Sequence, residues 1–547
     1  MADSWKPLQK QEMKHYEAID KESLEFLSNR YNKVNRWVIA DMIRRSAYRY
    51  PDKPALIFKD RTLTYSQLEA DCNRVANALE ELGVKKYDRV AILAHNTLDH
   101  VLTWIGCAKI GAVYLAINYL LRGKDIAYCI NHSESAVFVV EDSLFDLVKD
   151  VVDDMPTVKT WIWSKQGAGK PANDGRFLDF ENWYAKYPAD EPDTILHIEE
   201  PCQMTYTSGT ESLPKGVLIS NQALMAQYMG AIVDGQYDET DINVNALPIY
   251  HCAQRDVFMN PVFWVGGTNV LILPDIGQIL KSLAEYKATM FFAPPTVWIG
   301  MLRHPDLATY DLSHLKKCYY GASIMPVEIL KEIMEKFPGT GIWNYYGQTE
   351  LAPYHTVLKA KDALRKLGSA GMGGLNMETR LEDDACNPIA QPGVPGEICG
   401  KGPHALIMYF KDPVKTEEAM KGGWFHSGDI GVMDEDRYIT VADRKKDMIK
   451  TGGENVPTRE VEEAIYLDPR VQEVAVIGLP DPKWVEKVTA VIVPKAGQTI
   501  TEEEIFAHCR KELAAFKCPK KVIFVDALPK TPTGKILKRE LRQRYNK

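Results

Sequence analysis

The chain has 547 residues, which is too long for one compact core and predicts two or more domains. Its hydrophobic fraction of 45% and charged fraction of 26% are those of an ordinary globular protein, which excludes a disordered or fibrous chain. The ten cysteines are scattered without a CxxC pair, which favours reduced thiols in a cytoplasmic protein over a disulfide framework or a metal-ligand spacing.

The net charge of −8 is unevenly distributed along the chain. Residues 443–547 contain 21 Lys and Arg against 16 Asp and Glu, a balance of +5, which leaves −13 for the first 442 residues. A basic portion on an acidic body could bind nucleic acid or close over a small polyanion. We favour the small polyanion and expect no nucleic-acid partner, because the basic residues alternate with acids and no aromatic-rich RNA-binding pattern accompanies them.

The first residues, MADSWKPLQKQEMK, are polar and do not resemble a secretory signal. The longest apolar stretch, IGAVYLAINYLL from Ile110, is too short and too polar to cross a bilayer. We therefore expect no membrane span and interpret this stretch as part of a core.

The first part of the chain alternates short apolar runs with helical patterns. RVAIL at 89–93 precedes a helical pattern at 96–111, and LKKCYY at 315–320 precedes PVEILKEIMEKF. This alternation is typical of α/β folds, in which ligands gather outside the carboxyl ends of the strands. We predict a large N-terminal domain of β-sheets flanked by helices, with GAS at 321–323 and GQTE at 347–350 facing one crevice.

The pattern changes after RYITVADRKKDMIKTGGENV, which ends at residue 456. Short strands such as VQEVAVIGL and VTAVIVP alternate with amphipathic helices, one of which begins with a capping box of Thr501 and Glu504. We predict a small α+β domain here and place the junction in the charged run DRKKD. The predicted division is therefore an N-terminal domain at 1–442, a hinge at 443–447 and a C-terminal domain at 448–547.

The stretch YTSGTESLPKGV, which begins at Tyr206, has the composition of a phosphate-binding loop. Backbone N–H groups of a Gly/Ser/Thr turn can form an anion-binding nest, and Lys215 adds a mobile charge. The stretch departs from the common nucleotide loop because Pro214 precedes the lysine and Glu211 lies inside. Taken alone, an ordinary surface turn fits it equally well.

Three further stretches carry side chains that suit a nucleotide. In NYYGQTE, Thr349 offers a hydroxyl to phosphate and Glu350 offers a carboxylate oxygen to Mg²⁺. Asp429 is predicted in a Gly-flanked turn, where it could hold ribose hydroxyls, and Arg444 could bind phosphate or ribose. Lys535 follows a Pro-Thr-Gly turn before a basic helix. Each of these alone is also compatible with solvated surface charge.

Taken in order, five stretches resemble the adenylate-forming superfamily, which contains acyl- and aryl-CoA synthetases, adenylation domains of peptide synthetases and firefly-type luciferases. They are TSGTESLPKG, YYGQTE, HSGDIG, DRKKDMIKTGGENV and PKTPTGKILKRELR. The resemblance extends from about DKPALIFKDRTLTYSQL to the C-terminus. It implies an N-terminal domain that binds ATP and an acid, a small mobile lid domain, and a reaction in two steps. A carboxylate first attacks the α-phosphate of ATP, and a thiol then displaces AMP.

The resemblance also implies roles for individual residues. Those implied to bind ATP or CoA are Thr207, Ser208, Gly209, Thr210 and Lys215 at the β- and γ-phosphates, Gly321, Ala322 and Ser323 along adenine, Tyr346 stacked on its ring, Asp429 and Arg444 at the ribose, and Gly452 and Gly453 at the pantetheine tunnel. Thr349 is implied to touch the α-phosphate and Glu350 to hold Mg²⁺. Lys446 matches the hinge between two poses, so Lys535 is implied to act only in adenylation.

The phosphate loop departs from the superfamily pattern TSGTTGxPKG. Glu211 and Ser212 replace the second Thr and the Gly. A carboxylate near a triphosphate is repulsive unless it faces a cation or solvent. We therefore predict that Glu211 points outward or pairs with a cation of the lid.

The segment LPIYHCAQRDVF resembles the one that gates the acyl pocket in the superfamily. His251 is therefore a predicted catalytic gate or neighbour of the carboxylate, and a histidine satisfied within packed structure is the alternative. Arg255 is expected to form a salt bridge rather than to bind substrate. The predicted pocket walls are Trp264, Trp298, Tyr345 and Leu351.

The predicted function is an AMP-forming acyl-CoA synthetase. It would convert a carboxylic acid, a fatty or other aliphatic one, together with ATP and CoA into acyl-CoA, AMP and pyrophosphate, with Mg²⁺ as the metal. Loading an aryl or acyl group onto an acyl-carrier protein is the alternative, and an inactive nucleotide-binding regulator is the second alternative. The sequence leaves a homodimer open.

Overall fold

Two large mixed sheets form the body of the protein in the computed structural model, which describes residues 21–167, 175–207, 214–323, 325–451, 454–531 and 535–546. The first sheet has nine strands in the order β16-β15-β14-β13-β12-β10-β11-β1-β2. Its strands are β1 (Pro54–Phe58), β2 (Arg61–Thr64), β10 (Ile242–Asn245), β11 (Thr268–Leu271), β12 (Met290–Ala293), β13 (Lys317–Gly321), β14 (Gly341–Tyr346), β15 (Thr356–Leu358) and β16 (Met372–Gly373).

The second sheet has eight strands in the order β20-β9-β8-β4-β3-β5-β6-β7. They are β3 (Arg89–Leu93), β4 (Val113–Ala116), β5 (Ser135–Glu141), β6 (Thr160–Ser164), β7 (Phe177–Asp179), β8 (Pro201–Thr207), β9 (Lys215–Ser220) and β20 (Met408–Tyr409). A smaller five-stranded sheet joins β17 (Glu378–Glu382), β18 (Pro388–Ile389), β19 (Pro395–Lys401), β21 (Phe425–Met433) and β22 (Ile439–Arg444).

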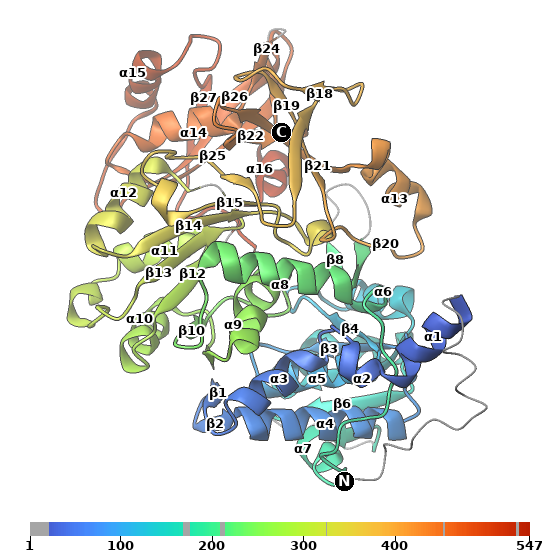
Figure 1. Cartoon of the computed structure of the whole chain (residues 1–547). Helices are drawn as coiled ribbons and strands as arrows, with labels where there is room; N and C mark the ends of the chain where they lie inside the picture. The colour runs from blue at the N-terminus through green and yellow to red at the C-terminus, as the bar shows by residue number, and fades with distance from the viewer. Residues whose placement is uncertain are drawn as a thin grey trace.

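Helices pack on both large sheets, and α8 runs between them in the view of Figure 1. The helices of this part are α1 (Lys21–Arg30), α2 (Asn32–Asn35), α3 (Asp41–Arg49), α4 (Tyr65–Glu81), α5 (Leu98–Lys109), α6 (Lys124–Ser133), α7 (Phe180–Tyr184), α8 (Asn221–Gly235), α9 (Asn260–Val265), α10 (Ile276–Glu285), α11 (Pro295–Leu302), α12 (Val327–Lys336) and α13 (Pro413–Ala419). Because both faces of the parallel strands are covered, their residues form near-continuous apolar runs. The four residues of β12 are all buried, for example.

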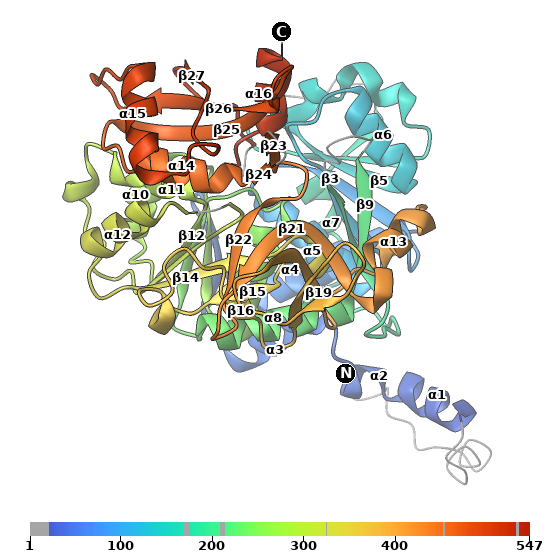
Figure 2. The same ribbon diagram turned by 90° about the horizontal axis from the view of Figure 1, so that it is seen from above.

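The C-terminal part is a smaller α+β unit that lies against the large domain (Figures 1 and 2). Its sheet contains β23 (Ile449–Thr451), β24 (Glu454–Val456), β25 (Val471–Asp481), β26 (Val485–Pro494) and β27 (Lys521–Phe524). Its helices are α14 (Thr458–Tyr466), α15 (Glu502–Glu512) and α16 (Lys538–Tyr545). The predicted capping box of Thr501 and Glu504 is confirmed at the start of α15. The predicted α/β class, with a large sheet domain and a small α+β domain, is thus the observed one.

The charged run DRKKD lies where the chain passes from one sheet to another. Arg444 ends β22 in the five-stranded sheet of the large domain, and Ile449 begins β23 in the sheet of the small domain. Backbone N–H groups of Asp447 and Met448 both donate to the carbonyl of Arg444, at 2.8 and 3.1 Å, so a tight turn joins the two strands. The boundaries predicted at 442 and 448 stay predictions, although this passage is the one that a hinge requires.

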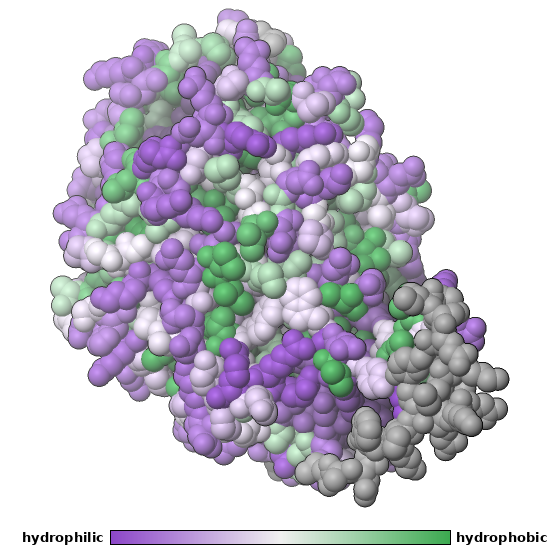
Figure 3. All heavy atoms as spheres, viewed as in Figure 1, coloured by the Kyte–Doolittle hydropathy of each residue, from purple (hydrophilic) through white to green (hydrophobic). Residues whose placement is uncertain are grey.

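The predicted strands and helices at the crevice are confirmed. RVAIL forms β3, LKKCYY contributes most of β13, and the helical patterns that follow them form α5 and α12. The stretch IGAVYLAINYLL contains β4, whose four residues are buried. Within the described ranges no helix combines the length and the apolar character needed to cross a bilayer. Hydrophobic residues reach the face shown in Figure 3 mostly in small groups among polar ones.

Candidate active site

The carboxyl ends of β13 and β14 place the adenine-motif residues next to each other. The two strands run parallel with Gly321 opposite Tyr345. A Cβ atom on Gly321 would lie 2.3 Å from the carbonyl oxygen of Tyr345, so only glycine fits this close approach. Ala322 follows with a φ of 62°, a left-handed conformation that is uncommon for alanine. This turn directs Ala322 and Ser323 into a cavity of about 550 Å³.

That cavity collects much of the predicted site from both domains. Tyr346 and Asp429 line it from the large domain, and Lys535 lines it from the small domain. Arg444 and Lys446 lie between them in the chain and line it too. The predicted residues that line this cavity are therefore Ala322, Ser323, Tyr346, Asp429, Arg444, Lys446 and Lys535. They come from widely separated motifs and meet where the two domains join.

Asp429 is held in place by two partners. The hydroxyl of Tyr346 donates to Asp429 Oδ2 at 2.7 Å, and Arg444 Nε lies 3.3 Å from Oδ1. The prediction that Asp429 lies in a turn is wrong, because it is inside β21, where it pairs in register with Arg444 of β22. Gly428, with a φ of 71°, accommodates a bend without ending the strand. The antiparallel pairing therefore fixes the carboxylate and the guanidinium side by side.

Lys535 brings a positive charge into this cavity from the small domain. Its backbone N–H donates to Thr531 Oγ1 at 3.0 Å, which supports the turn before α16. Burial, together with the charges of Arg444 and Lys446, lowers the pKa of Lys535 to about 8, against the opposite effect of Asp429 and Asp447. A half-buried lysine with this pKa beside two other cations is suited to an anionic ligand.

A second group of predicted residues lies at the ends of β8 and β9 and around η6 (Thr349–Leu351). Thr207 and Lys215 are opposite each other in the antiparallel pair of β8 and β9. Lys215 Nζ lies 5.0 Å from the ring centre of Tyr409, whose hydroxyl donates to Glu350 Oε1 at 2.9 Å. Thr207, Lys215, Thr349, Glu350 and His251 do not line the 550 Å³ cavity. Tyr409 thus joins the phosphate-loop lysine to the predicted metal ligand.

Glu350 fits a hard cation. Burial raises the pKa of its carboxyl, against the Tyr409 hydroxyl and the charges of Arg444 and Lys215. Because burial opposes the negative charge, a divalent cation beside this carboxylate would be favourable, and carboxylate oxygens are the ligands that Mg²⁺ prefers.

His251 lies in the segment that precedes η4 (Ala253–Met259), a π-helix. Cys252 Sγ lies 3.3 Å from Thr349 Oγ1, so it connects this segment to the GQTE motif. His251 Nδ1 accepts from the backbone N–H of Ala253 at 3.2 Å. Burial lowers the pKa of His251 to about 4, with Arg255 and Lys535 contributing. Its imidazole is therefore neutral at pH 7, with Nε2 as the N–H donor.

Several of the predicted site residues are not among those that the structure describes, and others lie away from the cavity. Ser208, Gly209, Thr210 and Glu211 of the phosphate loop, with Gly452 and Gly453 of KTGGEN, lie outside the described residues. Of the predicted pocket walls, Tyr345 lines the cavity, whereas Trp298 is core and donates to the carbonyl of Tyr319. Trp264 packs against Trp37. The salt bridge predicted for Arg255 is confirmed, with Asp256 Oδ2 at 2.8 Å.

Two residues that the sequence motifs did not predict contribute to this region. Tyr409 is one, and its place in the edge strand β20, which pairs with β9, was not evident from the motif pattern. Arg459 of α14 is the other. Its guanidinium donates to the carbonyl oxygens of Val441 and Gly368 in the large domain, the latter at 2.9 Å. A basic residue just after GGENVP was the available signal, but its partners are distant in the chain.

Comparison with known proteins identifies the family. Residues 43–410 match the family described as AMP-binding enzyme, and residues 460–535 match the AMP-binding enzyme C-terminal domain. The chain belongs to the AMP-binding enzyme family. It is an acid–thiol ligase of the adenylate-forming superfamily, as its motifs predicted.

Individual relatives in this family cover nearly the whole chain. A feruloyl-CoA synthase of Amycolatopsis sp is 32% identical over 503 residues, covering 92% of this chain and 98% of the relative. A long-chain-fatty-acid–CoA ligase of Escherichia coli O157:H7 is also 32% identical, over 532 residues, covering 92% and 94%. The crystal structure of the anthranilate CoA ligase AuaEII with anthranoyl-AMP superposes with a TM-score of 0.86 at 27% identity, covering 93% and 97%.

Proposed function

We propose that this ligase converts an aliphatic carboxylic acid to its CoA thioester through an acyl-adenylate, with Lys535 acting in the first step only. The single observation that carries the proposal is the meeting of Lys535 with Tyr346, Asp429 and Arg444 in one cavity between the two domains. ATP and CoA are the co-substrates that its family uses. The fatty-acid ligase among its relatives favours an aliphatic acid, and the feruloyl and anthranilate enzymes make an aryl acid the competing substrate class.

The residues at the cavity would hold the nucleotide by its sugar and base. Asp429, fixed by Tyr346 and Arg444, presents a carboxylate that suits the vicinal hydroxyls of ribose. The turn of Gly321, Ala322 and Ser323 offers a flat backbone surface for adenine, and Tyr346 closes the site beside it. Thr207 and Lys215 would meet the β- and γ-phosphates from the ends of β8 and β9.

Adenylation joins two anions, so positive charge must surround the α-phosphate. Lys535 approaches from the small domain, and Thr349 offers a hydroxyl from the large domain. Glu350 would hold Mg²⁺, which when bound supplies further positive charge beside the phosphates. His251, neutral and with Nε2 as donor, would orient the incoming carboxylate. The closed pair of domains would hold both substrates in position, and this positioning would supply much of the rate enhancement.

The second step needs a different arrangement, because CoA must reach the carbonyl carbon of the acyl-adenylate. Lys535 occupies the cavity in the arrangement observed, which is the one suited to adenylation. Rotation at Lys446 would withdraw Lys535 and bring KTGGEN towards the cavity. The thiol sulfur would then attack the carbonyl carbon, and the bond to the AMP oxygen would break.

A pyrophosphate-release assay tests the function. The purified enzyme is given Mg²⁺, ATP and a panel of acids that includes short-chain, medium-chain and long-chain fatty acids, ferulate and anthranilate, with and without CoA. We expect acyl-CoA and AMP in equal amounts with an aliphatic acid. Turnover confined to aryl acids would overturn the substrate class. AMP formation that ignores CoA and requires a carrier protein would instead show carrier loading, and absence of release with every acid would favour a nucleotide-binding regulator.

A further inference from the structure

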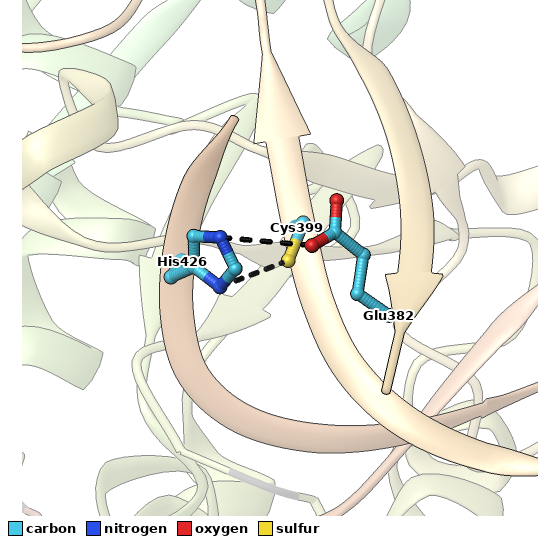
Figure 4. Close-up of side chains that lie close together, drawn as sticks. All are labelled: Glu382, Cys399 and His426. Atoms are coloured by element: carbon cyan, nitrogen blue, oxygen red, sulfur yellow. Dashed lines mark hydrogen bonds and ion pairs between the residues drawn. The ribbon is translucent and has the colours of Figure 1, made fainter. Parts of the chain in front are cut away.

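A cysteine, a histidine and two glutamates gather on three neighbouring strands of the five-stranded sheet. Glu382 ends β17, Cys399 lies in β19 and His426 lies in β21. Ligand atoms of these three residues all lie within 4.8 Å of one another, and Figure 4 shows the side chains converging. Glu397, two residues before Cys399, has its Oε2 atom 3.5 Å from His426 Nδ1.

The hydrogen bonds of His426 leave one ring nitrogen facing other electron-rich atoms. His426 Nε2 lies 3.1 Å from the carbonyl oxygen of Lys421, which can only accept, so Nε2 carries a proton. In the neutral imidazole, Nδ1 then carries no proton and offers a lone pair. It faces Cys399 Sγ at 3.5 Å and Glu397 Oε2 at 3.5 Å. Nδ1 and Glu397 Oε2 both offer lone pairs here, so a cation bound between them and the sulfur would be favourable.

Glu382 supplies an independent indication of a missing ligand. Its side chain is 1% exposed, and Arg380 Nε donates to its Oε1 atom at 2.7 Å. Its Oε2 atom is buried and accepts no hydrogen bond from any residue that the structure describes, and His426 Nε2 is 3.6 Å away. Burying a carboxylate oxygen without a partner is costly, so an occupant of this position would be stabilising.

We propose that Cys399, His426, Glu382 and Glu397 form a binding site for a divalent transition-metal ion, with zinc as the metal that their chemistry favours. A thiolate, an imidazole and carboxylates are the ligands that Zn²⁺ prefers in a tetrahedral site, and sulfur disfavours Mg²⁺ and Ca²⁺. The N–H of His426 Nε2 on a backbone carbonyl is the outer contact that fixes a metal-bound histidine. Arg380 and Lys445, next to the two glutamates, offset the excess negative charge.

The proposed ion would also support the nucleotide site. β21 carries His426 and, three residues later, Asp429. The backbone N–H of Gly428 donates to Glu397 Oε1 at 2.9 Å, which already connects the proposed site to the residue before Asp429. A metal that joins β17, β19 and β21 would hold this strand rigid. Its role is structural, because its ligands lie outside the lining of the nucleotide cavity.

Binding involves a balanced exchange of a proton for the metal. A cysteine thiol has an ordinary pKa of about 8.5, so it is mostly protonated at pH 7 when no metal is bound. The metal forms a bond to sulfur as the S–H bond breaks, and the proton passes to solvent. The affinity should therefore rise with pH.

A cobalt titration tests the site without relying on activity. The full-length protein is dialysed against a chelator and titrated with Co²⁺, because a cobalt–thiolate bond produces a charge-transfer absorption band. We expect one saturable equivalent, displacement by Zn²⁺ and no response to Mg²⁺. Cys399→Ser should abolish the band, and His426→Gln and Glu382→Gln should weaken binding at least about 100-fold. Cys129→Ser, at another buried cysteine, should titrate like the wild type.

The outcomes separate the metal from the competing occupant, a proton on His426. Absence of the band in the wild type, or an equal band in Cys399→Ser, would overturn the proposal and leave a protonated histidine between the two glutamates. Circular dichroism checks the fold of each variant. Should Cys399→Ser not fold, His426→Gln keeps the thiol and carries the test, since undiminished cobalt affinity in that variant contradicts the site.

Discussion

Two cations of this enzyme, Arg255 and Lys535, have opposite surroundings in the fold. Arg255, in the middle of the large domain, is 1% exposed. Its guanidinium donates to both carboxylate oxygens of Asp256, at 3.0 and 2.8 Å, and to Gln203 Oε1 at 2.8 Å. Burial disfavours the charge, but Asp256 outweighs burial and raises the pKa of Arg255. All the groups that bind the Arg255 guanidinium here are side chains of the protein.

Lys535 has the opposite environment. Burial, Arg444 and Lys446 lower its pKa, and its Nζ atom forms no ion pair with a residue in the described ranges. A cation kept for stability would have a carboxylate beside it, as Arg255 has. The difference supports the proposal that Lys535 is placed for an anion that arrives with the substrate, whereas Arg255 stabilises the large domain.

Removing the paired cation should have the largest effect on stability. Arg255→Met leaves the buried carboxylate of Asp256 without a positive charge beside it, so the free energy of unfolding should fall by about 3–5 kcal/mol. The first unfolding transition in a urea titration measures this free energy. Arg303→Met, which removes a more exposed pair with Glu332, is the control and should cost less than about 1 kcal/mol. Equal losses in the two variants would mean that the Arg255 network does not stabilise the domain.

Removing the unpaired cation should affect chemistry instead. Lys535→Ala should lower ATP–pyrophosphate exchange about 10²–10³-fold, because the positive charge at the α-phosphate is lost. Its thermal midpoint should not fall, since the lysine makes no ion pair in the described part of the chain. Thioester formation from a supplied acyl-adenylate should persist, and Lys520→Ala, at an exposed lysine of the same domain, should leave both steps intact. An equal loss of both half-reactions in Lys535→Ala would show that the lysine does not leave the site.

Much of the fold could be predicted because it follows local patterns. The apolar run of β3 and the capping box of α15 are periodic or short-range signals that a single sequence contains. The family could be predicted because five motifs occur in order. Asp429 was placed in a turn because its flanking glycines signal one, yet pairing with β22 kept the strand continuous. Tertiary pairing had overridden a local turn signal.

The contacts that could not be predicted are those between distant segments. Tyr409 reaches Glu350 across 59 residues and Arg459 reaches Gly368 across 91. Neither distance leaves a periodic trace in the sequence. The proposed metal ligands are similar, because Glu382, Cys399 and His426 lie on three strands and only the antiparallel register brings them together. The spacing of the cysteines alone gave no metal signal.

Arg459 can show whether the small domain must be held in the observed pose. Its bonds to Gly368 and Val441 cross between the domains, so Arg459→Met should lower adenylation about tenfold or more, since a charged hydrogen bond is worth about 1.5–3 kcal/mol. Thioester formation from acyl-adenylate should be unchanged or faster. Arg470→Met, whose partner Asp468 lies within the small domain, is the matched control. Equal losses in adenylation and in thioester formation would mean that Arg459 only stabilises the fold.

The pH dependence of adenylation tests whether the charge of Lys535 itself is needed. A lysine is positive below its pKa, so with a pKa of about 8 the charged fraction of the free enzyme falls from roughly 90% at pH 7 to roughly 10% at pH 9. Adenylation kcat/KM for ATP, which reports the free enzyme, should therefore be nearly full at pH 7, about half at pH 8 and about tenfold lower at pH 9. Bound triphosphate favours the charged form, so the same limb in kcat should lie at higher pH. Lys535→Arg keeps its charge throughout this range and should lose the alkaline limb, even at a lower overall rate. A limb that persists in Lys535→Arg would assign the titration to another group, and the contrast with Arg255 would then rest on position alone.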